Sequence, residues 1–125
     1  MSRVLSKNTK PELILRRSLH GMGYRYLTNV KALPGKPDIA FTKKKRVIFV
    51  NGCFWHSHSC KWGRVTPATN AAFWADKRRA TMERDLRKTI DLQFIGWKVL
   101  TVWECDLRSL EHVLPRVTQF LGAPR

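Results

Sequence analysis

The sequence predicts a single α/β domain in which helices flank a mixed central sheet. Segments with helical apolar spacing and short β-branched segments follow one another in the order α-β-β-β-loop-α-β-α. The 125 residues are 43% hydrophobic, with five Trp and six Phe, which excludes a disordered chain and suffices for one core. Since no repeat, low-complexity tract or linker divides the chain, we expect one domain over residues 1–125.

The N-terminal third is predicted to contain a helix, a strand and a turn. A capping-box pattern at residues 9–12, with a proline in the first turn, predicts where the helix begins, and Gly21 or Gly23 ends it. Residues 24–29 predict a strand. Residues 33–37 predict a turn, because two prolines and a glycine cannot extend a helix.

Two further strands precede a long loop. Residues 38–42 predict a short strand, and a basic hairpin at residues 43–45 joins it to residues 46–50. The last run is almost continuously apolar and β-branched, which is typical of a central strand buried on both faces. Residues 51–70 show neither helical nor strand periodicity, and an irregular loop of this length needs a stabilising link such as a bound metal.

The second half predicts a long helix, a strand and one or two short helices. Helical spacing over residues 71–95 ends at Gly96, residues 98–103 form an apolar strand, and residues 106–121 form short helices with Pro115 at a boundary. The long helix carries Arg84, Arg87, Lys88 and Asp91 largely on one face. On its other face we expect an apolar row made of Met82, Leu86, Ile90 and Phe94.

The charge of the chain indicates a polyanionic partner. There are 24 Lys and Arg residues against 9 Asp and Glu, so the formal net charge is +15, and the pI is about 10.6. Such a charge repels itself unless phosphates neutralise it, which favours nucleic acid. A mean hydropathy of −0.35 and the lack of a long uncharged apolar run exclude a membrane span. No apolar signal stretch follows Met1, so we expect a reducing cytoplasm.

Cysteines and histidines suggest a zinc site. Cys53 and Cys60 lie in the long loop, and Cys105 follows a predicted strand. Three thiolates and one imidazole suit zinc, and a closed site of four ligands would stabilise the loop. The spacing leaves open whether His56 or His58 is the ligand. Buried free cysteines are the alternative.

Asp38 is a candidate magnesium ligand. It is the only acidic residue between Glu12 and Asp76, and cations surround it in the sequence, at Lys36 and residues 43–46. We therefore expect its pKa to be low. A lone carboxylate disfavours DNA binding unless a hard divalent cation bridges it to a phosphate. The alternative is an ordinary turn residue or an ion pair with a neighbouring lysine.

Another histidine and several aromatic residues are further candidates. If His58 binds zinc, His56 is left as a general base that can accept a proton from water. Phe54, Trp55 and Trp74 lie in or beside the irregular segment. In a chain of this charge they could stack on bases or wedge between them, and burial in the core is the alternative.

Several motifs together resemble one protein family. Over nearly its whole length the chain is similar to the very-short-patch repair (Vsr) mismatch endonucleases. The resemblance rests on the order of residues 34–38 (PGKPD), 47–56 (VIFVNGCFWH), 70–74 (NAAFW), 83–85 (ERD), 96–100 (GWKVL) and 102–105 (VWEC).

The resemblance implies a fold and an activity. The fold is a restriction-endonuclease-like (PD-(D/E)XK-type) core. The activity is Mg²⁺-dependent nicking of double-stranded DNA on the 5′ side of the thymine in a T·G mismatch, which arises by deamination of 5-methylcytosine. It further implies a protein of the bacterial cytoplasm, associated with the nucleoid. A monomer with one site would nick one strand instead of cutting both.

Motif positions carry the family's site residues onto this chain. The resemblance assigns Mg²⁺ to Asp38 and to the main-chain carbonyl of Val50, and it makes His56 the base that activates water. Asp85 matches an acid that orients this histidine, whereas its spacing alone predicts an i,i+3 partner of Lys88. Zinc is assigned to Cys53, His58, Cys60 and Cys105.

The DNA contacts follow in the same way. Phe54, Trp55 and Trp74 match aromatic residues that enter the duplex beside the mismatch. The chain begins close to the first helix, which leaves few residues for an N-terminal arm. Cations expected at the DNA backbone are Lys36, Arg3, Lys7 and Lys10.

One position departs from the family pattern, and two rival functions remain. Well-known members have Thr-His where this chain has Val50 and Asn51. Asn51 thus occupies a catalytic position. An amide can hydrogen-bond a phosphate but cannot protonate it, so we expect the rate or the metal preference to differ from those of the family. The rivals are a nickase or restriction-type nuclease that ignores mismatches, and a zinc-stapled DNA-binding module that has lost catalysis.

Overall fold

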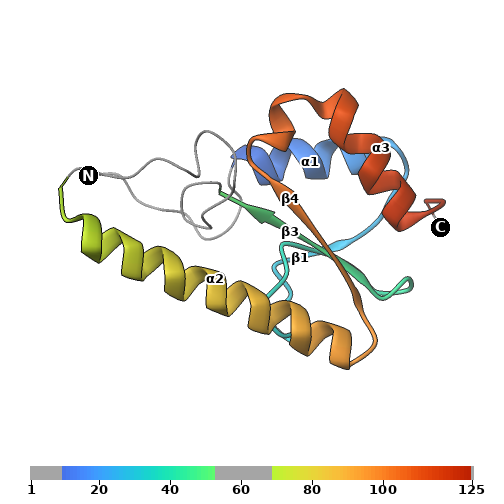
Figure 1. Ribbon diagram of the computed structural model, residues 1–125. Coiled ribbons are helices and arrows are strands. Elements are labelled where there is room, and N and C mark those ends of the chain that lie inside the picture. The colour runs from blue at the N-terminus through green and yellow to red at the C-terminus, as the bar shows by residue number, and fades with distance from the viewer. Residues whose placement is uncertain (1–9, 53–68, 125) are drawn as a thin grey trace.

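The computed structural model describes residues 10–52 and 69–124, and its elements follow the predicted order (Figure 1). Three α-helices, a short 3-10 helix and a four-stranded sheet make up these residues. In chain order the elements are α1 (Lys10–Gly21), β1 (Leu27–Thr28), β2 (Ile39–Phe41), β3 (Arg46–Asn51), α2 (Ala71–Phe94), β4 (Lys98–Trp103), η1 (Asp106–Arg108) and α3 (Leu110–Leu121).

The sheet is mixed, as predicted. Its strand order is β1-β2-β3-β4; β2 is antiparallel to both β1 and β3, and β4 is parallel to β3. The parallel pair needs a crossover, which contains α2. Val47 and Ile48 of β3 are fully buried on opposite faces, which confirms the prediction of a central strand.

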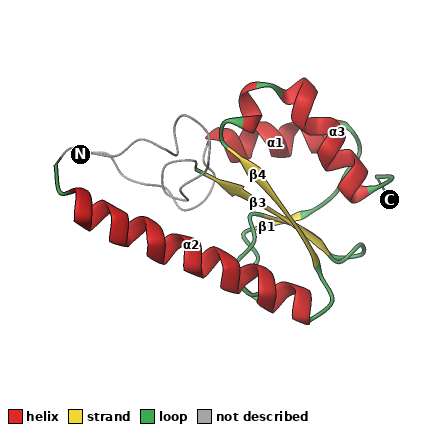
Figure 2. Ribbon diagram, viewed as in Figure 1, coloured by secondary structure: helices red, strands yellow, loops and turns green. Residues whose placement is uncertain are grey.

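The helices cover both faces of the sheet (Figure 2). Leu15 and Leu19 of α1 and Val113 and Val117 of α3 pack with Ile48 in the larger core cluster. On the other face, Leu92 of α2 packs with Ala40, Val47 and Phe49. This is a three-layer α/β arrangement. Among the described residues, no helix combines the length and the apolarity that a membrane crossing requires.

The predicted strand at residues 24–29 is shorter than expected. Only Leu27–Thr28 pairs with β2. The side chains of Tyr24 and Tyr26 instead link this segment to the helices, because their hydroxyls donate hydrogen bonds to the carbonyls of Gly122 and Arg16. These contacts hold residues 24–26 against the helices, so the segment does not extend the strand pairing with β2.

The prediction that Pro115 ends a helix is wrong. Pro115 lies inside α3, which runs through it from Leu110 to Leu121. Proline removes one backbone donor from a helix interior. Here the buried row of Val113, Val117 and Leu121 continues across that position, and its burial outweighs the lost hydrogen bond.

The apolar row of α2 does not pack on the core, contrary to the amphipathic pattern. The row is exposed, with 48% for Met82, 64% for Leu86, 51% for Ile90 and 90% for Phe94. Leu92 is the one fully buried residue of this helix. The face turned to the sheet carries polar side chains instead, and these belong to the site described next.

Candidate active site

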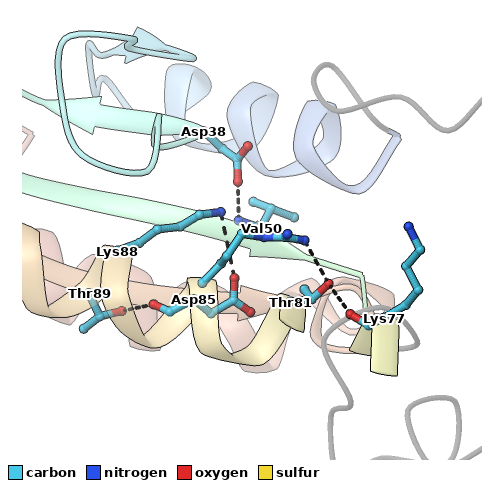
Figure 3. A network of polar contacts seen from close by, with 8 residues as sticks. Asp38, Val50, Lys77, Thr81, Asp85, Lys88 and Thr89 are labelled. Carbon is cyan, nitrogen blue, oxygen red and sulfur yellow. Dashed lines mark hydrogen bonds and ion pairs between the residues drawn. The ribbon is translucent and has the colours of Figure 1, made fainter. Parts of the chain in front are cut away.

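The site is centred on Asp38, at the residue that precedes β2. The antiparallel register of β2 and β3 brings this residue beside the C-terminal end of β3. There the main-chain N–H of Val50 donates a hydrogen bond of 2.6 Å to Oδ2 of Asp38 (Figure 3). The carbonyl of Asp38 accepts from the N–H of Asn29, 3.1 Å away, which fixes the turn on the other side.

Glu12 is a second carboxylate of this site, and the sequence patterns did not single it out. It lies in the first turn of α1 and is only 2% exposed. Its side chain hydrogen-bonds with Asp38, and it also forms an ion pair of 3.5 Å with Arg16. Its capping-box position suggested only a role in starting the helix, so burial against Asp38 could not be foreseen.

The expectation of a low pKa for Asp38 is wrong. Burial raises the pKa of Asp38 to about 7, against the lowering effect of the Val50 hydrogen bond; the charge and hydrogen bond of Glu12 raise it further, and the charge of Lys88 lowers it. The cations of residues 43–45, close to Asp38 in sequence, lie in the hairpin at the opposite end of β2 and β3. Residues close to Asp38 in sequence therefore do not provide the positive charge that was expected around its carboxylate.

Lys88 of α2 lies near Asp38, and its placement depends on Gly35. A Cβ atom on Gly35 would lie 2.5 Å from Cγ of Lys88, and Gly35 also has a φ of +75°, so a side chain is excluded there twice over. The ammonium group lies 5.6 Å from the centroid of the Phe49 ring. Lys88 is thus guided between the turn and β3 toward Asp38.

Asp85 lies one turn before Lys88 on the same helix. Its Oδ1 is 3.9 Å from Nζ of Lys88, which confirms the predicted i,i+3 pairing (Figure 3). The hydroxyl of Thr89 donates to the carbonyl of Asp85 at 3.1 Å. The predicted role of Asp85 toward His56 stays a prediction, because His56 lies outside the described residues.

The backbone of β3 turns the Val50 carbonyl toward Asp38. In an extended strand the N–H and C=O of one residue point to the same side, and this side alternates along the chain. The Asn51 carbonyl accepts from the N–H of Glu104, just beyond β4, so Val50 presents its polar groups to the other side, where Asp38 lies. Asn51 itself is 9% exposed, at the end of the same strand.

The donor set suits a hard divalent cation. Two carboxylates lie together in a largely buried position, and a main-chain carbonyl faces the same side. Oxygen ligands of this kind are those that Mg²⁺ uses in proteins. Burial raises the pKa of Asp38 and Glu12 raises it further, and the charge of a divalent ion would oppose both effects. The residues present therefore fit magnesium.

Other predicted site residues fall partly outside the structure. Lys36 is exposed in the turn before Asp38, and Trp74 is half-buried in α2, edge-to-face with Phe73 at 5.3 Å. Cys105 is half-buried just before η1. Within residues 10–52 and 69–124, no three His, Cys, Asp or Glu side chains gather as a metal site would need. The predicted site residues outside the described ranges are Arg3, Lys7, Cys53, Phe54, Trp55, His56, His58 and Cys60.

Comparisons with known proteins show which chains this sequence is similar to. Residues 1–62 match the family model described as DNA mismatch endonuclease Vsr. The type II nicking enzyme V.NmeAIP of Neisseria meningitidis is 45% identical, over 87% of this chain and 77% of its own length. The type II nicking enzyme V.XorIIP of Xanthomonas oryzae is 43% identical, over 97% and 88%. The DNA mismatch endonuclease Vsr of Escherichia coli is 41% identical, over 90% and 72%.

Proposed function

Because the chain belongs to the Vsr family of DNA mismatch endonucleases, we propose that it nicks one strand of duplex DNA at T·G mismatches with Mg²⁺ as cofactor. It is a DNA endonuclease, and the cut lies on the 5′ side of the mismatched thymine. The observation that carries the proposal is the buried pair of Asp38 and Glu12 beside Val50. The mixed sheet with helices on both faces supports a restriction-endonuclease-like core.

Asp38, Glu12 and the Val50 carbonyl would hold the magnesium ion. When bound there, Mg²⁺ polarises the scissile phosphate and stabilises negative charge on the leaving oxygen. The N–H of Val50 holds one carboxylate oxygen of Asp38, which orients the second oxygen. Arg16 holds Glu12 through an ion pair, so both carboxylates are held in place before DNA binds.

The chain's own side chains complete the reaction. His56 accepts a proton from the attacking water, whose oxygen bonds to phosphorus while the bond to the leaving oxygen of the sugar breaks. Lys88 presents a positive charge across from Asp38 and is suited to contact a non-bridging phosphate oxygen. Asn51, at the end of β3, can donate a hydrogen bond to the phosphate without protonating it.

A structural zinc site would support the loop that carries His56. We assign it to Cys53, His58, Cys60 and Cys105, whose sulfur and imidazole donors differ from the oxygen donors of the magnesium site. The half-buried position of Cys105 after β4 is compatible with this role. Zinc content by elemental analysis is expected at one ion per chain, and a folded protein without zinc would contradict the assignment.

The net charge supports duplex DNA as the substrate. With a formal charge of +15, the chain neutralises phosphates wherever it meets the backbone. Lys36, beside Asp38 in sequence and exposed, is placed to contact the strand that enters the site. Trp74 and the aromatic residues Phe54 and Trp55 would enter the duplex where mismatched pairing makes unstacking less costly. We place the protein with the nucleoid in the bacterial cytoplasm.

A second candidate is a nickase that does not require a mismatch. It is favoured by the similarity to V.NmeAIP and V.XorIIP, which are described as type II nicking enzymes. The two candidates share the magnesium site and differ only in which duplex is cut.

A strand-resolved cleavage assay distinguishes the candidates. End-labelled duplexes with T·G, C·G and T·A at one position are incubated with Mg²⁺, and each strand is followed separately. We expect one nick, 5′ of the T, in the T·G duplex alone. Equal nicking of matched duplexes would favour the second candidate, and tight binding without any nick would contradict both. Asp38→Asn and His56→Ala are expected to abolish the nick, whereas the exposed Glu111→Gln on α3 serves as the matched control.

A further inference from the structure

Lys88 interacts with carboxylates that come from two different parts of the fold. Its Nζ lies 3.9 Å from Oδ1 of Asp85, one turn earlier on α2, and its positive charge lowers the pKa of Asp38, which precedes β2. Figure 3 shows the ammonium group between these two carboxylates. A cation of the chain thus lies where the acidic groups of the site come together.

The Lys88 side chain is held in this position by its neighbours. Gly35 lies so close that a Cβ atom there would be 2.8 Å from Cβ and 2.5 Å from Cγ of Lys88. The ring of Phe49 lies 5.6 Å from Nζ, a distance that suits a cation–π contact. Leu92, one turn later on α2, is fully buried against the sheet and fixes the rotation of the helix. The ammonium group is therefore directed to the carboxylates and is not free to move away into solvent.

We propose that the ammonium group of Lys88 takes the place of a second divalent ion, so that this active site binds one Mg²⁺ and not two. The inference rests on the proposed function and specifies how many ions the reaction needs. In two-metal sites the ions lie about 3.5–4 Å apart, close enough to share ligands. Asp38 and Asp85 could hold a second ion next to the first, but Lys88 already interacts with both. An ion placed there would meet a fixed positive charge.

The charges of the site balance with one ion. Three carboxylates, those of Asp38, Glu12 and Asp85, accompany two cations, Arg16 and Lys88, so these five side chains carry one net negative charge when all are ionised. One Mg²⁺ changes this to one net positive charge, which the single negative charge of a phosphodiester neutralises. A second Mg²⁺ would leave two uncompensated positive charges in a partly buried site, where unpaired charge is costly.

An ion pair that only braces α2 is the alternative role for Lys88. Pairs at i,i+3 are common on helix surfaces, and most need no further explanation. A brace does not explain why the side chain passes over Gly35 to a carboxylate on another element. The two roles also differ in their consequences: loss of a brace changes stability alone, whereas loss of a substitute cation changes the number of ions that bind.

Manganese binding to the full chain tests the proposal. Mn²⁺ accepts the same oxygen ligands as Mg²⁺, and electron paramagnetic resonance detects it while zinc stays silent. We expect the natural chain and Lys88→Arg to bind one Mn²⁺ in the active site. Lys88→Asp exchanges the cation for a further carboxylate, so we expect it to bind two Mn²⁺ ions. Their spectrum should show exchange coupling, because the two ions share ligands.

Two further variants make the outcome specific. Arg87→Asp is the matched control, since it makes the same change of charge at an exposed position of α2 and should give no coupled pair. Lys88→Asn removes the cation without adding a charge, and it should admit the second, coupled ion at a higher Mn²⁺ concentration. Circular dichroism checks the fold of each variant, and Lys88→Asn decides the question if Lys88→Asp does not fold.

The possible results separate this proposal from the proposed function. A coupled pair in the natural chain, or a single ion in the folded Lys88→Asp and Lys88→Asn variants, would overturn the proposal and leave the magnesium site of Asp38 and Glu12 standing. A natural chain that binds no Mn²⁺ would contradict both that site and the role of Lys88.

Discussion

Replacing Asp38 by Asn should stabilise the protein in the absence of Mg²⁺ while it abolishes nicking. Burial raises the pKa of Asp38 to about 7, from an ordinary value of 3.8. Between these values the folded chain binds more protons than the unfolded chain, so the stability contributed by protonated Asp38 is lost as the pH rises toward 7 and above. Asn keeps an oxygen that can accept the Val50 N–H, and it carries no charge beside Glu12.

The size of the effect follows from the pKa shift. A shift of this size corresponds to a destabilisation on the order of 4 kcal/mol by pH 8, of which about 2–3 kcal/mol develops between pH 5 and pH 8. For a chain of this length, 1 kcal/mol changes the melting temperature by about 4 °C. The advantage of Asp38→Asn in melting temperature should therefore grow by roughly 10 °C between pH 5 and pH 8.

Thermal unfolding of the two proteins in Mg²⁺-free buffer without chelator checks this prediction, so that any zinc stays bound. Glu111→Gln is the control, because its carboxylate is exposed and should give a constant difference from the natural chain. A difference between Asp38→Asn and the natural chain that stays constant, or shrinks, from pH 5 to pH 8 would refute the reasoning from burial.

Three further outcomes are expected. Gly35→Ala forces a Cβ atom against the Lys88 side chain at a positive φ, so it should cost about 1–3 kcal/mol in chemical denaturation and reduce nicking; an unchanged midpoint would count against the close approach. Lys88→Met removes a charge that lowers the pKa of Asp38, so that pKa, followed by carboxyl NMR without Mg²⁺, should rise further; a fall would contradict the placement of Lys88. DNA affinity should fall with salt, with a slope of log K against log[salt] of about −0.9 per phosphate contacted, and a flat dependence would argue against nucleic acid.

Much of the fold could be predicted because local patterns and tertiary packing agree. The β-branched run of β3 is buried on both faces, and α1 is helical from Lys10, within the segment where the pattern predicts a helix start. Patterns failed where packing outweighed a local rule. Pro115 did not end α3, because a buried apolar row continues through it.

The surroundings of the candidate site could not be predicted from a single sequence. Asp38 was found because it is a lone carboxylate, but its surroundings were misjudged, since Glu12 is brought to it by α1 and the hairpin cations are carried away. Lys88 was assigned to a charged helix face and in fact points to the site. Contacts between residues far apart in sequence decide electrostatics, and spacing along the chain does not encode them.

The exposed row of α2 is a related case. Apolar residues at helical spacing normally predict a face that packs on the core, but here the face that meets the sheet carries Asp85 and Lys88 of the site together with the buried Leu92. Periodicity identifies an apolar face without identifying what covers it.

The Mg²⁺ dependence of nicking by Glu12→Gln tests the central claim most directly, because Glu12 was identified from the fold alone. Nicking of one T·G duplex is measured over a Mg²⁺ titration for the natural chain, Glu12→Gln and the exposed control Glu111→Gln. The carboxylate pair predicts that Glu12→Gln needs at least about tenfold more Mg²⁺ for half-maximal nicking, or loses activity at every concentration. A titration curve for Glu12→Gln that superimposes on that of the natural chain would contradict a metal site built from Asp38 and Glu12.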